Sequence, residues 1–180
     1  MASQLPSCTF VVVSGPPASG KTSLARTIAP ALDLPLIAKD TIKQALMTVL
    51  PVPDIGASRL VGAASVAALL AVAADTRGAL LESVWHRSRA LDDLRRLPGH
   101  VVEVFCRCDP WIAAQRYALR AGTRDAGHFD AERTTAELWN DEVARPVAGD
   151  WPVIEISTNS PVDVNPLIAR IRAAATAARL

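Results

Sequence analysis

The 180-residue sequence has few cysteines, no run of basic residues and no long hydrophobic segment, and each shortage excludes a class of protein. Cys8, Cys106 and Cys108 are an odd number of cysteines without paired C-x-x-C spacing, so neither a disulfide framework nor a zinc site is expected. The formal net charge is only +1, whereas binding to a nucleic-acid backbone needs clustered Lys and Arg. A small molecule is therefore the expected partner, and the cysteines are expected to be buried thiols in a reducing compartment.

No targeting or membrane segment is predicted. Residues 1–7 lack the basic and apolar regions of a secretory signal, which favours a cytoplasmic location. The longest uncharged apolar stretch, Leu60 to Ala74, would span about 22 Å as a helix, against a hydrocarbon core of about 30 Å, and is expected to be a core or interface helix. Without a repeat or a linker, the chain is predicted to form one domain over residues 1–180.

The most specific pattern lies near the N-terminus. An apolar run from Thr9 to Ser14 precedes a match to the Walker A pattern G-x-x-x-x-G-K-[ST], and an amphipathic segment over residues 23–32 follows it. A strand before and a helix after are the context that this motif requires, so a phosphate-binding loop is favoured over a chance glycine-rich turn. The loop consists of Gly15, Pro16, Pro17, Ala18, Ser19, Gly20, Lys21 and Thr22.

Each residue type in this loop has a physical role. Gly15 and Gly20 allow tight backbone turns, so that successive N–H groups point into one concavity and can hold phosphate oxygens. Lys21 supplies a positive charge for the outer phosphates, and the Thr22 hydroxyl can ligate Mg²⁺. The helix that begins at Ser23 directs its positive end at the same anion.

Short apolar segments alternate with helical segments along the chain, which predicts an α/β fold with a parallel sheet covered on both faces. The predicted strands are residues 9–14, 34–38, 78–85, 100–108 and 153–156. Helices are predicted over residues 41–50, 54–74, 88–97, 110–120, 130–144 and 162–180. The second helix of the chain has apolar residues at helical spacing, Ile42, Leu46 and Val49. The polar segment 121–129 is predicted to be a mobile loop.

In such sheets ligands bind at the carboxyl ends of the strands, and two acidic residues are expected there. Asp40 follows the second strand and could accept the proton of an attacking hydroxyl, cap the next helix, or do both. Glu82 ends the third apolar run, as a Walker B acid does, and could hold a Mg²⁺-bound water or a substrate hydroxyl, or simply mark the strand end. Either carboxylate could be the base.

Further candidates flank these strand ends. Trp85, His86 and Arg87 could line an acceptor pocket, although core packing is the alternative for Trp85. Three arginines, Arg116, Arg120 and Arg124, are spaced by four residues, which puts the first two on one helix face. They could neutralise charge on a transferring phosphoryl group or form a solvated basic face. His128 is expected at the surface.

Four segments give the chain a family resemblance: GPPASGKTSLA, IAKDTIKQAL, the strand ending at Glu82, and DPWIAAQRYALRAGTR. In them the chain resembles P-loop kinases of small molecules, a group that contains the chloramphenicol phosphotransferases, the zeta-toxin kinases and AAA_33-type predicted kinases. The resemblance implies a three-layer P-loop NTPase fold with strand order 2-3-1-4-5 and ATP with Mg²⁺ as the phosphoryl donor. It also implies Asp40 as the base, a lid around residues 121–129 with the three arginines, Thr158 and Asn159 near the adenine, and the helix 54–74 as a wall of the acceptor site.

Three functions are compatible with these features. The first is an ATP- and Mg²⁺-dependent kinase that moves the γ-phosphate to a hydroxyl of a small molecule, with antibiotics and other specialised metabolites among the candidates. The second is a nucleotide-dependent switch that binds a protein partner through the apolar helix. The third is a nucleoside or nucleotide kinase. A monomer and a homodimer are both compatible with the sequence.

Overall fold

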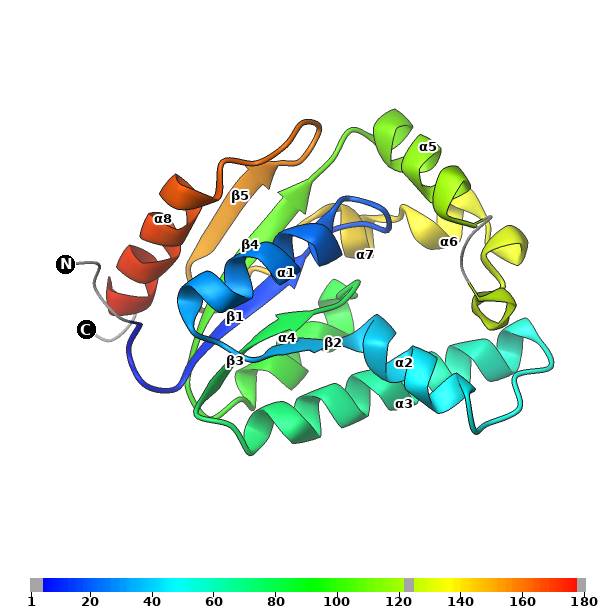
Figure 1. The fold of residues 1–180 in the computed structure, drawn as a ribbon, viewed down its shortest axis with the longest axis horizontal. Helices are drawn as coiled ribbons and strands as arrows, with labels where there is room; N and C mark the ends of the chain where they lie inside the picture. The colour runs from blue at the N-terminus through cyan, green and yellow to red at the C-terminus, as the bar shows by residue number, and fades with distance from the viewer. Residues whose placement is uncertain (1–4, 122–124, 178–180) are drawn as a thin grey trace.

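A computed structural model describes residues 5–121 and 125–177 (Figure 1). Its centre is a five-stranded sheet in which every neighbouring pair of strands is parallel, with the order β2-β3-β1-β4-β5. The strands are β1 (Thr9–Ser14), β2 (Leu36–Ala38), β3 (Gly78–Glu82), β4 (His100–Arg107) and β5 (Val153–Ser157). The predicted α/β fold and strand order are confirmed.

Helices cover the sheet and extend beyond its carboxyl edge. They are α1 (Lys21–Leu32), α2 (Lys39–Met47), α3 (Ile55–Ala74), α4 (Arg87–Arg95), α5 (Pro110–Ala121), α6 (Thr135–Leu138), α7 (Asp141–Ala144) and α8 (Val164–Ala177). Two 3-10 turns, η1 (Ala126–His128) and η2 (Asp130–Glu132), precede α6. In Figure 1, α5 and α6 lie on the opposite side of the carboxyl edge of the sheet from α2 and α3.

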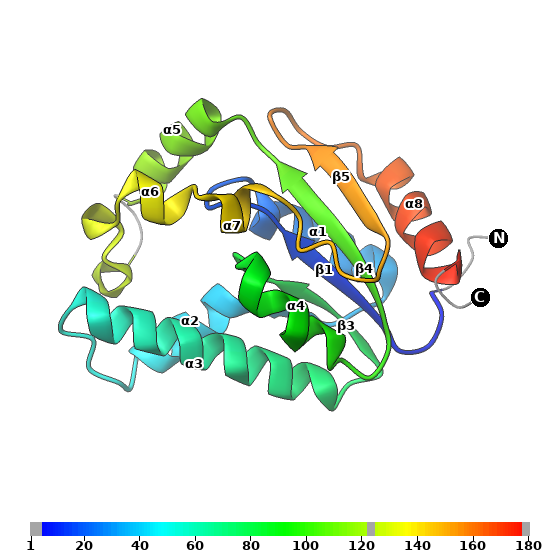
Figure 2. The same cartoon turned by 180° about the vertical axis from the view of Figure 1, so that it is seen from behind.

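The alternation of side chains along β1 creates two hydrophobic cores, one on each face of the sheet. Val11 and Val13 belong to the core that α1 and α8 cover, on the face seen in Figure 1. Phe10 and Val12 belong to the core that α3 and α4 cover, on the face seen in Figure 2. All four side chains are fully buried, as expected for the central strand of a three-layer fold.

Several predicted elements differ from the observed ones. The helix predicted over residues 130–144 is wrong: η2, α6 and α7 replace it, because Thr134 and Asn140 each begin a new helical turn. The Thr134 side chain accepts a hydrogen bond from the Glu137 amide, and the Asn140 side chain accepts one from the Glu142 amide. The strand predicted up to residue 85 ends at Glu82.

The helix predicted over residues 54–74 is confirmed as α3, which is longer than the uncharged apolar stretch from Leu60 to Ala74 within it. Asp54 caps it and it contains 20 residues, so its length of about 30 Å matches a membrane core, and by length and composition it could cross one. The length argument against a membrane span is therefore wrong. Its packing is the better guide: Leu69 and Ala73 are fully buried in the core over the sheet, and the helix also packs along α2. This placement favours a wall of the functional site over a membrane span.

A buried carboxylate on β4 joins three parts of the fold. Glu103 is fully buried and accepts hydrogen bonds from the Ser14 hydroxyl at 2.6 Å and from the amides of Val147 and Ala148 at 2.8 and 2.9 Å. The indole Nε1 of Trp151 donates to it at 3.2 Å. The network connects the end of β1 to the segment that leads into β5.

Replacing this carboxylate should cost stability. We expect Glu103→Gln to lower the free energy of unfolding by about 2 to 4 kcal/mol, because an amide places its NH₂ group against donors that the carboxylate oxygens now satisfy. Urea unfolding measures the change. The matched control is Glu155→Gln, at an exposed position on the neighbouring strand. Equal losses in the two variants would contradict a specific role for the network.

Candidate active site

The loop between β1 and α1 has a backbone conformation that favours glycine at two positions. Gly15 has a φ of 133°, and a Cβ there would lie 2.6 Å from the carbonyl oxygen of Cys106 on β4. Gly20 has a φ of 84° and forms the N-terminal cap of α1. The loop is therefore pressed against β4 and leads directly into the positive end of a 12-residue helix, the arrangement that binds phosphate.

Lys21 and Glu82 form the charged centre of the site. Lys21 is buried, and its Nζ donates to the carbonyl oxygen of Pro16 at 2.7 Å. Burial lowers the pKa of Lys21, while the charge of Glu82 opposes that decrease. Burial likewise raises the pKa of Glu82, and Lys21 and the Thr22 hydroxyl oppose the increase. For both groups the loss of hydration outweighs the attraction of the opposite charge.

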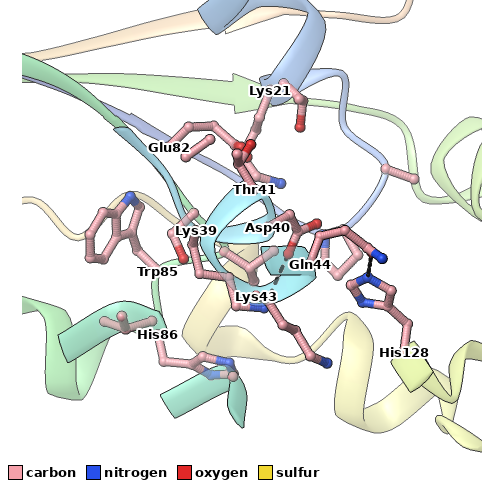
Figure 3. A pocket seen from close by; sticks show the side chains of 18 of the residues that line it. Lys21, Lys39, Asp40, Thr41, Lys43, Gln44, Glu82, Trp85, His86 and His128 are labelled. Atoms are coloured by element: carbon pink, nitrogen blue, oxygen red, sulfur yellow. Dashed lines mark hydrogen bonds and ion pairs between the residues drawn. The ribbon is translucent and has the colours of Figure 1, made fainter. Parts of the chain in front are cut away.

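One cavity of about 1310 Å³ extends from the phosphate-binding loop to α2, α3 and the segment that contains η1 and α6. Ligand pockets are usually about 300 to 1,000 Å³, so this cavity has room for more than one small molecule. Figure 3 shows Asp40 and Lys39 between Trp85 and His86 on one side and His128 on the other. Lys39 Nζ lies 3.1 Å from the Asp40 carboxylate, so the cavity contains an ion pair at the start of α2.

Most of the predicted site residues line this cavity. Those that do are Pro17, Ala18, Gly20, Lys21, Thr22, Ser23, Asp40, Glu82, Trp85, His86, Arg116 and Arg120. Gly15, Pro16 and Ser19 belong to the same loop without lining the cavity. Arg87 does not line it either, because its Nε donates to the carbonyl oxygen of Val147. Arg124 lies outside the described residues.

Arg116 connects α5 to the loop after β5. Its guanidinium donates to the carbonyl oxygens of Thr158 at 2.9 Å and Asn159 at 3.2 Å. Gly20 is adjacent, since a Cβ on it would lie 3.8 Å from Thr158 Cβ and 4.0 Å from Arg116 Nη1. Thr158 and Asn159, the two residues predicted near the adenine, therefore lie beside the phosphate-binding loop. Arg116 holds them there through its hydrogen bonds to their carbonyl oxygens.

Trp85 packs in the hydrophobic core, which was the alternative to a place in the acceptor pocket, and it also lines the cavity. Its Nε1 and the Ser19 hydroxyl are buried polar atoms that make no hydrogen bond within the described part of the chain. Next to it, burial and the charge of Arg89 lower the pKa of His86. His86 is therefore neutral at pH 7 and can either donate or accept a hydrogen bond.

The sequence analysis missed a group of contacts on the α2 side of the cavity. Lys43 is only 2% exposed, and its Nζ donates to the Ser58 hydroxyl at 2.7 Å. That hydroxyl donates to the carbonyl oxygen of Gly127 at 2.7 Å. Gln44 donates from Nε2 to Asp125 at 3.2 Å, and its Oε1 lies 3.3 Å from His128 Nε2.

These contacts dock residues 125–128 onto α2 and α3. The predicted surface position of His128 is wrong, because its side chain is buried against Gln44. The presence of Lys43, one of only three lysines, within a predicted amphipathic helix was the only signal in the sequence. Val49, predicted within that helix, lies beyond its end at Met47 and is 77% exposed.

Two further contacts close the cavity from the α6 side. Glu137 accepts hydrogen bonds from Arg59 on α3 and from Arg133. Trp139 packs edge-on against Tyr117 of α5, and its Nε1 lies 3.4 Å from the carbonyl oxygen of Pro17. The segment after α5 therefore contacts both the phosphate-binding loop and the helices opposite it.

The described residues contain no cluster of three or more His, Cys, Asp or Glu side chains that could hold a metal ion by themselves. A Mg²⁺ site of the kind that P-loop enzymes use does not need one, since that ion retains several waters and takes ligands from the substrate phosphates. The Thr22 hydroxyl and the Glu82 carboxylate interact through a hydrogen bond and both line the cavity, so they are the side chains that would hold such an ion.

No protein-family model and no curated protein matches the sequence. Among solved structures, the chain is similar to a putative kinase from Chloroflexus aurantiacus J-10-fl, with 26% identity, a TM-score of 0.83, and coverage of 95% of this chain and 99% of that one. It also has the fold of a gluconokinase from Sinorhizobium meliloti 1021, with 20% identity, a TM-score of 0.57, and coverage of 98% and 93%. A shikimate kinase from Acinetobacter baumannii, solved with shikimate, has 17% identity, a TM-score of 0.57, and coverage of 94% and 92%.

These neighbours and the strand order define the class: the chain has the fold of the P-loop kinases. The neighbours whose names specify a substrate are small-molecule kinases, which agrees with the predicted resemblance at the level of the fold. The more specific resemblance to chloramphenicol phosphotransferases and zeta-toxin kinases stays a prediction.

The docking of residues 125–128 can be tested directly. We expect Gln44→Ala to speed amide exchange at His128 and Phe129 about tenfold, because two hydrogen bonds worth together about 1 to 2 kcal/mol are lost. Hydrogen exchange followed by NMR measures this. Gln115→Ala, at an exposed position on α5, is the matched control. Unchanged exchange in Gln44→Ala would show that Gln44 does not hold the segment.

Proposed function

We propose that the protein is an ATP- and Mg²⁺-dependent phosphotransferase that moves the γ-phosphate to a hydroxyl of a small molecule. The observation that carries this proposal is the single cavity that joins Lys21 and Thr22 to Asp40 and to the walls formed by α2 and α3. A nucleotide phosphate site alone would not need a second, adjoining space with a carboxylate at its entrance. Antibiotics and other specialised metabolites are among the candidate acceptors.

The proposed roles follow from position. Backbone N–H groups of the loop and Lys21 hold the phosphates, and Thr22 and Glu82 hold Mg²⁺, which supplies charge neutralisation when bound. Asp40 accepts the proton of the acceptor hydroxyl, whose oxygen bonds to the γ-phosphorus as the bond from that phosphorus to the ADP oxygen breaks. Its carboxylate is 40% exposed, so a substrate hydroxyl can reach it.

Arg116, Arg120 and Arg124 are proposed to neutralise charge on the transferring group. Arg120 lines the cavity with its guanidinium 5.4 Å from the centre of the Tyr117 ring, which restricts its orientation. Residues 121–129 are proposed as part of a lid, and closure would exclude water and limit ATP hydrolysis. Thr158 and Asn159 are proposed to lie against the adenine, and His86 and Trp85 against the acceptor.

The location, the partners and the oligomeric state of the protein are also proposals. A cytoplasmic location and a small-molecule substrate, without nucleic acid or membrane, fit the charge and the fold. Monomer and homodimer both stay open. A nucleoside or nucleotide kinase is the alternative within the same chemistry, distinguished by its acceptor.

One observation favours a second candidate, a nucleotide-dependent switch. Leu60 and Val72 on α3 are 72% and 53% exposed, so the helix presents apolar side chains to solvent. Light scattering with and without ATP separates the candidates. A mass that does not respond to nucleotide counts against the switch.

The Lys21 prediction tests the phosphate site. Lys21→Ala should abolish detectable Mg·ATP binding in calorimetry, because backbone donors alone would face the outer phosphates. Unchanged affinity would overturn the assignment of the loop.

The same variant identifies true products. Mixtures of antibiotics, sugars and nucleosides are incubated with Mg·ATP and either protein, and mass spectrometry detects any compound that gains one phosphoryl group. A product that is absent with Lys21→Ala establishes the kinase. ATP binding without any such product would favour the switch.

Asp40 is predicted to be the base. Asp40→Asn should lower kcat by about 10²- to 10⁴-fold, the usual contribution of general base catalysis, while the affinity for Mg·ATP stays nearly the same. Asp92→Asn, at an exposed site on α4, is the matched control. A fully active Asp40→Asn enzyme would leave Glu82 as the base to be tested.

A further inference from the structure

The part of the cavity beyond Asp40 has an apolar wall on one side of α3. Gly62, Ala63, Val66, Ala67 and Leu70 all line the cavity. Gly62, Val66 and Leu70 are spaced by four residues, as are Ala63 and Ala67, which places all five on one side of the helix. The polar residues of α3 that line it, Ser58 and Arg59, lie in its first turn and a half. The remaining three turns therefore present only hydrogen, methyl, isopropyl and isobutyl groups.

The wall of the cavity that faces α3 is apolar at its base, called the floor here, and polar at its edge, called the rim. Val84, Trp85 and Ala90 contribute to the floor, and Trp85 packs in the same hydrophobic core as Val66 and Leu70. His86 and Arg89 line the cavity at the start of α4. Arg89 is exposed and makes no ion pair with any residue in the described ranges, so its charge is available to a ligand.

Lys39 marks where the apolar wall begins. A Cβ placed on Gly62 would lie 3.9 Å from both Cε and Nζ of Lys39, so this side chain crosses α3 at the glycine. The same Nζ lies 3.1 Å from the Asp40 carboxylate. The space beside Asp40 and Lys39 therefore adjoins Gly62, where the apolar face that continues to Val66 and Leu70 begins.

A wall of this kind discriminates between classes of alcohol. A sugar or a nucleoside would bring several hydroxyls against methyl groups that cannot hydrogen-bond, and each unsatisfied polar group costs about 1 to 3 kcal/mol on the protein scale. An aromatic or aliphatic body would instead bury apolar surface against the wall, which favours binding. The positive charge of Arg89 at the rim suits one oxygen-bearing group at the far end of such a molecule, although Asp93 of the same helix also lines the cavity.

We propose that the acceptor is an amphipathic alcohol, with its hydroxyl at Asp40, an apolar body against the Gly62–Leu70 face of α3 and Trp85, and a carboxylate or carbonyl group toward Arg89. This inference rests on the proposed kinase function and assigns specificity to residues that take no part in phosphoryl transfer. Ala63 and Ala67 are specificity-determining because their small side chains leave the space that the apolar body occupies.

The test compares two alanines that are adjacent in the sequence. Ala63 and Ala64 are both exposed, but only Ala63 lines the cavity. The full-length protein, Ala63→Leu and Ala64→Leu are assayed for ADP release with Mg·ATP and five probes: phenylpropanol, hydroxypropylbenzoate, gluconate, ribose and adenosine. Ala67→Leu with Ala71→Leu as its control repeats the comparison one turn further along α3, should either first variant fail to fold.

The proposal expects the two aromatic alcohols to have the highest kcat/KM of the five. Ala63→Leu should raise their KM by about tenfold or more, the effect of a few carbon atoms in an apolar pocket, with KM for ATP unchanged. Ala64→Leu should change neither. An Arg89→Gln variant should weaken hydroxypropylbenzoate while leaving the uncharged phenylpropanol as it was.

Two other outcomes have distinct meanings. If gluconate, ribose or adenosine is the preferred acceptor, or if Ala63→Leu and Ala64→Leu behave alike, the amphipathic acceptor is wrong while the kinase function stands. If Mg·ATP binds in calorimetry but none of the five probes, nor any compound of the mixed panel, gains a phosphoryl group, both the inference and the proposed function are overturned.

Discussion

The close approach of Gly15 to strand β4 is the constraint on which the site depends. There is no room for a side chain between this residue and the carbonyl oxygen of Cys106, so the loop turns at the edge of the sheet and delivers its N–H groups to one point. Ser14, one residue earlier, is tied by its hydroxyl to the buried Glu103 carboxylate. Because Glu103 also accepts hydrogen bonds from the segment before β5, the start of the phosphate-binding loop is connected to β4 and to that segment.

In the loop and at the neighbouring strand end, the fold buries two charged side chains that would otherwise be solvated, Lys21 and Glu82. Lys21 and Glu82 both have pKa values displaced toward their neutral forms, chiefly by burial, so their mutual attraction does not offset the loss of water. Such displacement is common where a charge awaits a ligand of the opposite sign. The phosphates of a nucleotide would supply that charge to Lys21, and a divalent cation would supply it to Glu82. Binding is then expected to relieve an electrostatic cost that folding alone leaves in place.

The parts of the site that the sequence predicted are local, and the parts that it missed are not. The phosphate-binding loop is one continuous motif with its own strand and helix, so residues 9–32 were sufficient to recognise it, and the strand order came from the family resemblance. The burial of His128 instead depends on Gln44, which is 84 residues away. The Glu103 network spans 44 to 89 residues. Composition and periodicity carry no information about such pairs. The wrong helix predicted over residues 130–144 has a local cause instead, because Thr134 and Asn140 are favourable caps inside an otherwise helical pattern.

The segment after α5 contacts both halves of the cavity, and its two sets of contacts differ in kind. Toward the phosphate-binding loop, the contact of Trp139 with Pro17 is long, at 3.4 Å, and goes to the backbone. Toward α2 and α3, one part-buried hydrogen bond from the Ser58 hydroxyl and contacts with Gln44 are joined by the Arg59–Glu137 ion pair. The exposed ion pair contributes little by itself, whereas the short hydrogen bond from Ser58 is costlier to break. The position of this segment therefore depends more on α2 and α3, the walls of the proposed acceptor site, than on the nucleotide loop, and a molecule bound against α3 would act directly on the helices that hold it.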